Sequence, residues 1–176
     1  QSERLSQYEN YAKKLLESNQ AYYCFCSAEE IAKKREIAVK EGRSPHYDGT
    51  CAHLTPEEVQ KRLQQGEKAG LRFRALKKDI VINDLIRGEV NFKDGMVGDF
   101  FITRSPTEKE TQAGSQIGMP VYNFCSILDD ALMECTLVIR GEDHLSNTAR
   151  QVMILEALGL KTPQFAHLPM VLGAVS

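Results

Sequence analysis

The first part of the chain reads as helix, strand and helix. Residues 3–18 place apolar side chains at helical spacing on one face, which predicts an amphipathic helix. Ser2 is its expected cap, and Ser18 with Asn19 is its expected stop. Residues 21–26 are short, aromatic and β-prone, and therefore predict a strand.

Two charged helices follow, and each begins at a capping box. Ser27, followed three residues later by a glutamate, predicts a helix to about residue 42. Thr55, followed by a first-turn proline and again by a glutamate, predicts a second helix to about residue 65.

Beyond residue 70 the hydrophobic period changes to two. Four short strands are expected, and they suggest one compact, mostly antiparallel patch; they cover residues 71–76, 79–83, 89–92 and 98–103. Residues 105–118 are polar and non-periodic, which predicts an exposed, flexible loop.

The last third alternates between helices and strands. The pattern predicts a helix over 121–133, a buried strand over 135–139, a helix over 146–158 and a terminal strand near 167–172. Strands separated by helices imply a parallel sheet and an α/β fold. Ligands bind beyond the carboxyl ends of such strands, so the charged turn 140–144 is the first place to expect chemistry.

Composition and charge exclude several classes. Apolar residues make up 42% and charged residues 26% of the chain, which excludes disordered and fibrous proteins, and no run approaches a membrane span. Residues 1–80 hold 15 basic against 12 acidic side chains, while residues 81–176 hold 7 against 12. The mildly basic first part permits contact with a polyanion, although solvated lysines explain it equally. The missing initial Met and the apolar final residues suggest a fragment.

Cys24, Cys26, Cys51 and His53 form two closely spaced pairs of soft or borderline ligands. Four such ligands suit a closed, structural zinc site. Tyr47 is a rival fourth ligand. Alternatively, the first two cysteines are core-facing strand residues and the third is a free thiol.

The two remaining cysteines, Cys125 and Cys135, lie in apolar contexts and are expected to be reduced core residues rather than parts of a disulfide framework. Asp129 and Asp130 are adjacent on a helix and point about 100° apart. Surface or capping roles therefore suit them better than metal binding.

Arg140 ends a predicted strand and can grip a carboxylate or phosphate through two parallel hydrogen bonds. Glu142, Asp143 and His144 follow within reach of the same crevice. The alternative is a solvated loop with a local Arg–Glu pair. Nucleophile-elbow, P-loop and dinucleotide-binding motifs are absent from the sequence.

These motifs together resemble glutamyl-tRNA synthetases of the bacterial and organellar type. The match is most specific in residues 121–124, 128–130 and 138–148. It extends over nearly the whole chain, through residues 1–5, the cysteine and histidine cluster with 47–49, and residues 71–74, 84–88 and 165–169. Only residues 105–118 depart from the family pattern, as an insertion of unknown effect.

The resemblance implies part of a class I synthetase Rossmann-like fold with a connective α+β insertion. Residues 1–20 would end the first half of the catalytic fold. Residues 21–104 would form the connective, acceptor-stem-binding region with its zinc cluster. Residues 105–118 would be the flexible insertion, and residues 119–176 the second half of the fold.

The resemblance also implies residue roles. Tyr122, Ser126 and Arg140 match glutamate-binding positions, although some members carry Asn where this chain has Ser126. Asp143 and His144 match the position that meets ATP. No residue within the chain is assigned as catalytic. Zinc-bearing members match Cys24, Cys26, Cys51 and His53, whereas a tRNA-modifying paralogue uses a tyrosine placed like Tyr47.

The implied reaction joins L-glutamate to tRNA(Glu) with ATP and Mg²⁺, through a glutamyl-adenylate. The family's His-x-Gly-His element would precede Gln1 and its Lys-x-Ser-Lys loop would follow Leu172, so the isolated chain is predicted not to aminoacylate. A monomer without membrane contact is expected, in the bacterial cytoplasm or an organelle. The alternatives are the glutamyl-Q tRNA(Asp) synthetase paralogue and a zinc-stapled RNA-binding module that has lost catalysis.

Overall fold

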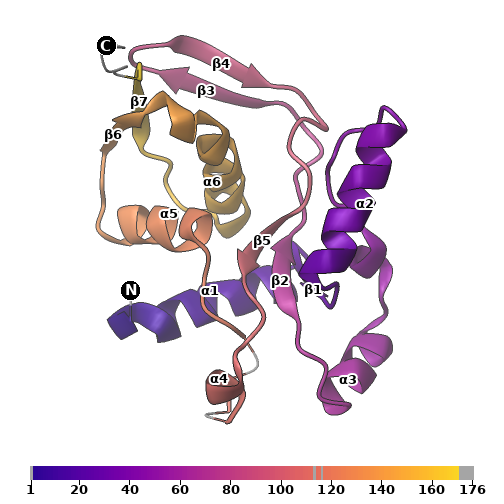
Figure 1. Ribbon diagram of the computed structural model, residues 1–176. Helices are drawn as coiled ribbons and strands as arrows, with labels where there is room; N and C mark the ends of the chain where they lie inside the picture. The colour runs from indigo at the N-terminus through magenta and orange to yellow at the C-terminus, as the bar shows by residue number, and fades with distance from the viewer. Residues whose placement is uncertain (1, 113, 116, 171–176) are drawn as a thin grey trace, which may run out of the picture. The chain divides into compact units, whose positions relative to one another are not determined.

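The computed structural model describes residues 2–112, 114–115 and 117–170. The chain divides into two compact units, residues 1–75 with 98–125 and residues 76–97 with 126–176. Figure 1 labels the elements of both units. The end of the predicted terminal strand and two residues of the predicted insertion lie outside the described residues.

The first unit is built on an antiparallel sheet of three strands in the order β1-β2-β5. The strands are β1 (Ala21–Cys24), β2 (Gly70–Phe73) and β5 (Phe100–Thr103). Ala21 pairs with Phe73 and Cys24 with Gly70. All four residues of β2 are buried, because this strand lies at the centre of the sheet.

The helices around this sheet confirm the sequence pattern (Figure 1). They are α1 (Leu5–Glu17), α2 (Ala28–Lys40) and α3 (Pro56–Gln64). Ser27 and Thr55 each cap their helix in a reciprocal capping box. Ser2 is not the cap of α1, because a 3₁₀ turn over Ser2–Arg4 precedes the helix and Arg4 occupies the cap position.

The expected loop over 105–118 contains a short helix, α4 (Glu108–Gln112). Glu110 accepts hydrogen bonds from both terminal nitrogens of Arg104, at 2.9 Å each, and from the backbone N–H of Thr107 at 2.6 Å. These bonds satisfy polar groups locally, so a segment without hydrophobic periodicity still forms a helical turn. The predicted helix after it is confirmed as α5 (Tyr122–Leu132).

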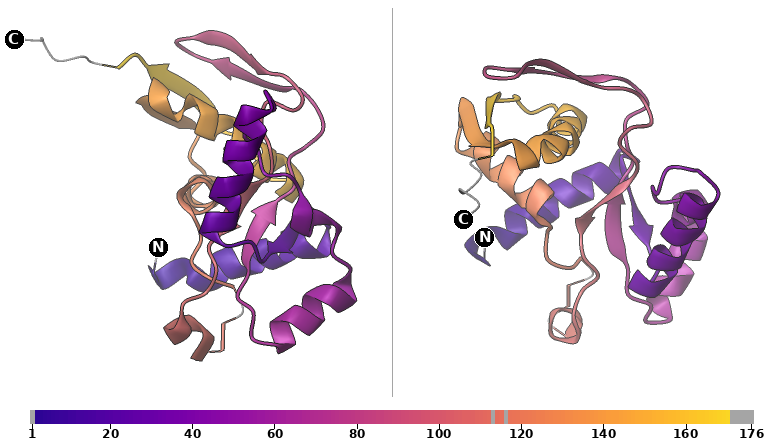
Figure 2. Two further views of the ribbon diagram at one scale, coloured as in Figure 1. Left: turned by 45° about the vertical axis from the view of Figure 1, so that its right-hand side comes forward. Right: turned by 45° about the horizontal axis from the view of Figure 1, so that its top comes forward.

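The second unit confirms the predicted parallel sheet and with it the α/β class. Its four strands follow the order β4-β3-β7-β6, with β7 parallel to both β3 and β6 and β4 antiparallel to β3. In both views of Figure 2 the β3–β4 hairpin lies alongside the orange and yellow elements. The elements are β3 (Ile80–Asp84), β4 (Gly88–Phe92), β6 (Leu137–Gly141), α6 (Leu145–Leu158) and β7 (Gln164–Leu168).

The expectation of one patch containing all four central strands is wrong. β2 and β5 belong to the three-stranded sheet, whereas β3 and β4 join the four-stranded sheet, where Asp84 pairs with Phe165 of β7. A period of two identifies the face that a side chain occupies and leaves the neighbouring strand undetermined.

The expectation of a buried strand before residue 140 is also wrong. β6 lies at the edge of its sheet, begins two residues later than expected, and leaves Ile139 60% exposed. Cys135, expected in the core, is exposed in the connection between α5 and β6, whereas Cys125 is buried as expected. No helix among the described residues is long and apolar enough to span a membrane.

Candidate functional site

Arg140 is the fourth residue of β6, and its guanidinium contacts buried side chains of the second unit. Nη2 donates to Thr148 Oγ1 at 2.5 Å and to Gln151 Oε1 at 2.6 Å, while Nε donates to His167 Nε2 at 3.4 Å. These bonds use both Nη2 hydrogens and the Nε hydrogen. Within the described part of the chain, Nη1 is left to meet a ligand. A pair of parallel hydrogen bonds to a carboxylate needs hydrogens from two guanidinium nitrogens. Because the hydrogens of Nε and Nη2 are already used, Arg140 cannot form the expected pair in this arrangement.

His167 lies on β7, and its side chain is fully buried together with that of Asp84. Nδ1 is 2.6 Å from Asp84 Oδ2, and Nε2 is 2.9 Å from Thr148 Oγ1. Asp84 ends β3 and also accepts the backbone N–H groups of Ile86 and Arg87 at 3.0 and 2.9 Å. Burial raises the pKa of Asp84, but these donors and His167 outweigh it and hold the pKa well below its usual range.

Ser126 joins the same group of polar residues through Gln151. Gln151 is fully buried on α6; its Oε1 accepts from Arg140, and its Nε2 donates to Ser126 Oγ at 2.8 Å. Two of the three residues predicted to bind glutamate, Ser126 and Arg140, are therefore connected through one amide. The third, Tyr122, begins α5, belongs to the first unit and is 49% exposed.

Residues 142–144 form the 3₁₀ turn between β6 and α6. Asp143 is exposed, and His144, half-buried, is the cap residue of α6. Glu142 forms an ion pair with Arg87, which lies outside the charged turn. A Cβ at Gly141 would meet the Asp143 carboxylate, so a larger residue there would displace this exposed side chain.

Three cysteines of the first unit converge as the sequence predicted. The sulfur atoms of Cys24, Cys26 and Cys51 all lie within 4.8 Å of one another. Gly49, with φ +77°, begins the 3₁₀ turn Thr50–His53 that carries the third cysteine. We call these three residues the cysteine cluster.

Tyr47, rather than His53, completes this arrangement. Its hydroxyl lies 3.2 Å from Cys26 Sγ and 3.5 Å from Cys24 Sγ, and it accepts the backbone N–H of Cys51 at 3.0 Å. His53 is exposed and is not among the ligand atoms that lie within 4.8 Å of one another. Spacing favoured the histidine, and which of the two residues is the fourth ligand stays a prediction.

A hydrogen bond between two thiols changes their acidity in opposite directions. It raises the pKa of Cys24 to about 12, with burial adding to the shift, and lowers the pKa of Cys51 to about 6. One proton shared between two sulfur atoms favours one thiolate. Thiolates are the form that binds zinc, so the chemistry of the cluster fits that metal.

Arg72 supplies positive charge beside the cluster. It is only 4% exposed at the centre of the sheet, and Nε donates to Cys24 Sγ at 3.2 Å. Its guanidinium carbon lies 3.8 Å from the ring centroids of both Tyr47 and Phe101. A buried guanidinium sandwiched between two rings and bonded to sulfur stabilises anionic thiolate.

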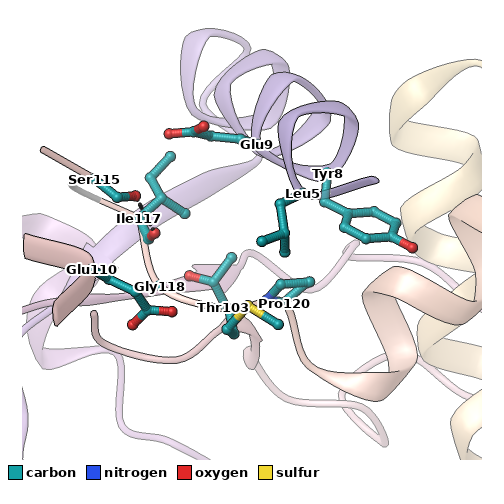
Figure 3. Close-up of a pocket in the computed structure, with 10 residues that line it drawn as sticks. Leu5, Tyr8, Glu9, Thr103, Glu110, Ser115, Ile117, Gly118 and Pro120 are labelled. Atoms are coloured by element: carbon teal, nitrogen blue, oxygen red, sulfur yellow. Dashed lines mark hydrogen bonds between the residues drawn. The ribbon is translucent and has the colours of Figure 1, made fainter. Parts of the chain in front are cut away.

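The first unit also contains an open pocket of about 290 Å³ between α1 and the segment 103–120 (Figure 3). Leu5, Ile117 and Pro120 supply apolar walls, while Glu9 and Glu110 supply carboxylates. The residues predicted to bind glutamate or ATP are not among those that line it.

Sequence reasoning missed the residues that surround the predicted ones. Arg72, Asp84 and His167 lie in segments that carry the family resemblance, but they were assigned no role. The available signal was a polar residue inside an apolar strand, as in Leu71-Arg72-Phe73 and Ala166-His167-Leu168. Thr148 and Gln151 follow helical spacing on α6 and gave no such signal.

Comparisons with known proteins match the whole chain. Residues 1–176 fit the family model of tRNA synthetases class I (E and Q), catalytic domain. A glutamate–tRNA ligase of a Hydrogenobaculum species is 49% identical over 174 residues, which are 98% of this chain and 35% of that protein. One from a Sulfurihydrogenibium species is 50% identical over 173 residues, 98% of this chain and 34% of that protein.

Solved structures agree with these sequences. The crystal structure of glutamate-tRNA synthetase from Elizabethkingia anophelis has a TM-score of 0.81 at 31% identity, over 99% of this chain and 35% of that one. A glutamate tRNA ligase from Elizabethkingia meningosepticum, in complex with its amino acid, matches equally well. The chain spans about a third of the length of these relatives. Because the family model matches from first residue to last, the chain belongs to the catalytic-domain family of class I tRNA synthetases (E and Q), as its resemblance to glutamyl-tRNA synthetases predicts.

Proposed function

We propose that this chain is the central part of a glutamate–tRNA ligase, which activates L-glutamate with ATP and transfers it to tRNA(Glu). Family membership and relatives named as glutamate–tRNA ligases support this function. Those relatives are about three times as long as the chain, which favours the ligase over the shorter paralogue.

Arg140 carries the proposal. The α-carboxylate of glutamate must attack the α-phosphate of ATP, so the carboxylate left for a guanidinium is the one on the side chain. Arg140, near the end of β6, offers Nη1 to this side-chain carboxylate. Ser126 is connected to Arg140 through Gln151, which hydrogen-bonds to both residues. A fixed positive charge favours glutamate over neutral glutamine, because glutamine leaves the guanidinium without an anion.

Asp143 and His144 are proposed to meet ATP. Both precede α6, a helix of 14 residues, at the end where backbone N–H groups favour a phosphate. Mg²⁺ bound with ATP would neutralise phosphate charge. The role of these two residues is to orient the nucleotide beside the end of β6.

We further propose that the cysteine cluster and Tyr47 hold a structural zinc ion. Three thiols and a phenol oxygen form a closed set of four ligands, which leaves no open position for catalysis. The ion would join β1, the loop before residue 50 and the turn that follows.

The test uses the full gene product with ATP, radiolabelled amino acid and tRNA. Charging with glutamate and not with glutamine is expected, and Arg140→Gln is expected to raise the KM for glutamate more than the KM for ATP. Binding of tRNA without affinity for ATP or glutamate would instead support the RNA-binding alternative. Charging of tRNA(Asp) would support the paralogue. Charging by the 176-residue chain alone would contradict the expectation that other elements complete the site.

A further inference from the structure

Arg140 touches three polar side chains, which together hold two of its three guanidinium nitrogens. Thr148 and Gln151 accept from Nη2, and His167 accepts from Nε. The guanidinium of Arg140 also faces the ring of Phe165, and its carbon lies 5.6 Å from the ring centroid. The orientation of the arginine is therefore set by α6 and β7 rather than by β6 itself.

The contact with Arg140 determines which nitrogen of His167 carries the proton. Arg140 Nε can only donate, so Nε2 of His167 accepts from it at 3.4 Å. Thr148 Oγ1 lies 2.9 Å from the same nitrogen and 3.2 Å from the carbonyl oxygen of His144, and its one hydrogen is shared between these two acceptors. The remaining hydrogen is then on Nδ1, where it is donated to Asp84 Oδ2 at 2.6 Å. Asp84 is held in turn by backbone N–H groups of Ile86, Arg87 and His167.

We infer that Asp84 and His167 are positioning residues that orient Arg140 for glutamate by fixing the histidine tautomer with Nδ1 protonated. This inference rests on the proposed role of Arg140. The opposite tautomer would place an N–H against the N–H of Arg140 and the guanidinium would turn away. This role links β3 to the proposed glutamate site through a fully buried residue pair.

Three substitutions in the full gene product separate this role from simple packing. Asp84→Asn presents an N–H to Nδ1 in one amide orientation, which favours the wrong tautomer. His167→Asn keeps a polar atom near Nδ1 and loses the acceptor near Arg140, whereas His167→Gln keeps an acceptor near Nε2. We expect Asp84→Asn and His167→Asn to raise the KM for glutamate about tenfold, with kcat and the KM for ATP changed less than about threefold. His167→Gln is expected to lie closer to wild type.

Ile82→Ala is the matched control, because Ile82 is buried on the same face of β3 two residues before Asp84. It should lower the melting temperature without moving the KM for glutamate. Nitrogen-15 NMR of the histidine rings gives a second readout: His167 should show a protonated Nδ1 and a bare Nε2, and Asp84→Asn should reverse them.

The outcomes distinguish this inference from the proposed function. If Arg140→Gln raises the KM for glutamate and the Asp84 and His167 variants do not, the positioning role is overturned and the function of Arg140 stands. Equal effects of His167→Asn and His167→Gln, or a protonated Nε2 in the wild type, would also overturn it. If Arg140→Gln leaves the KM for glutamate unchanged, both the proposed role of Arg140 and the positioning role fail.

Discussion

Arg72 donates a hydrogen bond from Nε to the sulfur of Cys24 at 3.2 Å, in the buried centre of the three-stranded sheet. A buried guanidinium needs a compensating negative charge. Cys24 would provide it once zinc binding removes its proton, since the pKa of this thiol is otherwise raised to about 12. The sheet and the cluster therefore depend on each other.

Replacing Arg72 should weaken zinc binding. Arg72→Gln removes the positive charge beside Cys24, and the affinity for zinc is expected to fall about tenfold, the lower end of the range for residues that support metal ligands. Competition with a chromophoric chelator measures the affinity. Lys13→Gln, which removes an exposed positive charge of α1 that faces Glu9, is the control and should change it little. Unchanged zinc affinity in Arg72→Gln would show that its charge is compensated elsewhere.

The identity of the fourth zinc ligand can be tested by two single substitutions. Tyr47→Phe removes only the hydroxyl that lies 3.2 Å from Cys26 Sγ, and His53→Ala removes the exposed imidazole. We expect Tyr47→Phe to lower zinc affinity and His53→Ala to leave it unchanged. The reverse result would restore the histidine as the ligand.

Removing the proposed zinc ion should loosen the region that it would join. A chelator is expected to lower the thermal midpoint and to speed amide hydrogen exchange over residues 21–55, because metal binding and folding are coupled there. Hydrogen-exchange mass spectrometry measures the exchange rates over residues 21–55, and the rates in β7 serve as the internal control. A midpoint unchanged after verified loss of zinc would contradict a structural role.

The carboxylate of Asp84 should make folding sensitive to acid. Its pKa in the folded protein lies below the unfolded value, so its stabilising contribution is complete above the unfolded pKa of about 4 and is lost as the pH falls through the lower pKa of the folded state. The difference in unfolding free energy between wild type and Asp84→Asn should therefore shrink over this range. Urea titrations at several pH values provide the measurement. A difference independent of pH would show that the carboxylate charge contributes nothing.

The capping boxes should contribute locally. Ser27→Ala removes the side chain that accepts the N–H of Glu30 at 3.2 Å and is expected to destabilise the start of α2 by about 1 kcal/mol. Hydrogen exchange in the first turn of the helix reports the loss. Ser27→Asp, which keeps an acceptor, should restore the protection, and equal exchange in both variants would argue against capping.

The sequence by itself determined the helices and their beginnings. The capping boxes at Ser27 and Thr55 act between residues three apart, and apolar spacing of 3.6 defines the buried face, so both signals are local. The convergence of the three cysteines was also predicted, because closely spaced soft ligands on either side of a helix suit one metal site. Their role as zinc ligands stays a prediction.

Only the tertiary structure decided which strands are neighbours and which polar residues meet. β6 lies at a sheet edge, so the apolar residues that suggested a buried strand are exposed. The hydroxyl of Tyr47 lies beside the sulfur atoms while His53 is exposed, which the spacing along the chain did not indicate. Asp84, Thr148 and His167 are up to 83 residues apart along the chain and meet only through the parallel pairing of β3 with β7 and the packing of α6. Periodicity and motifs are local properties, whereas these contacts arise from long-range pairing, which the order of residues alone does not specify.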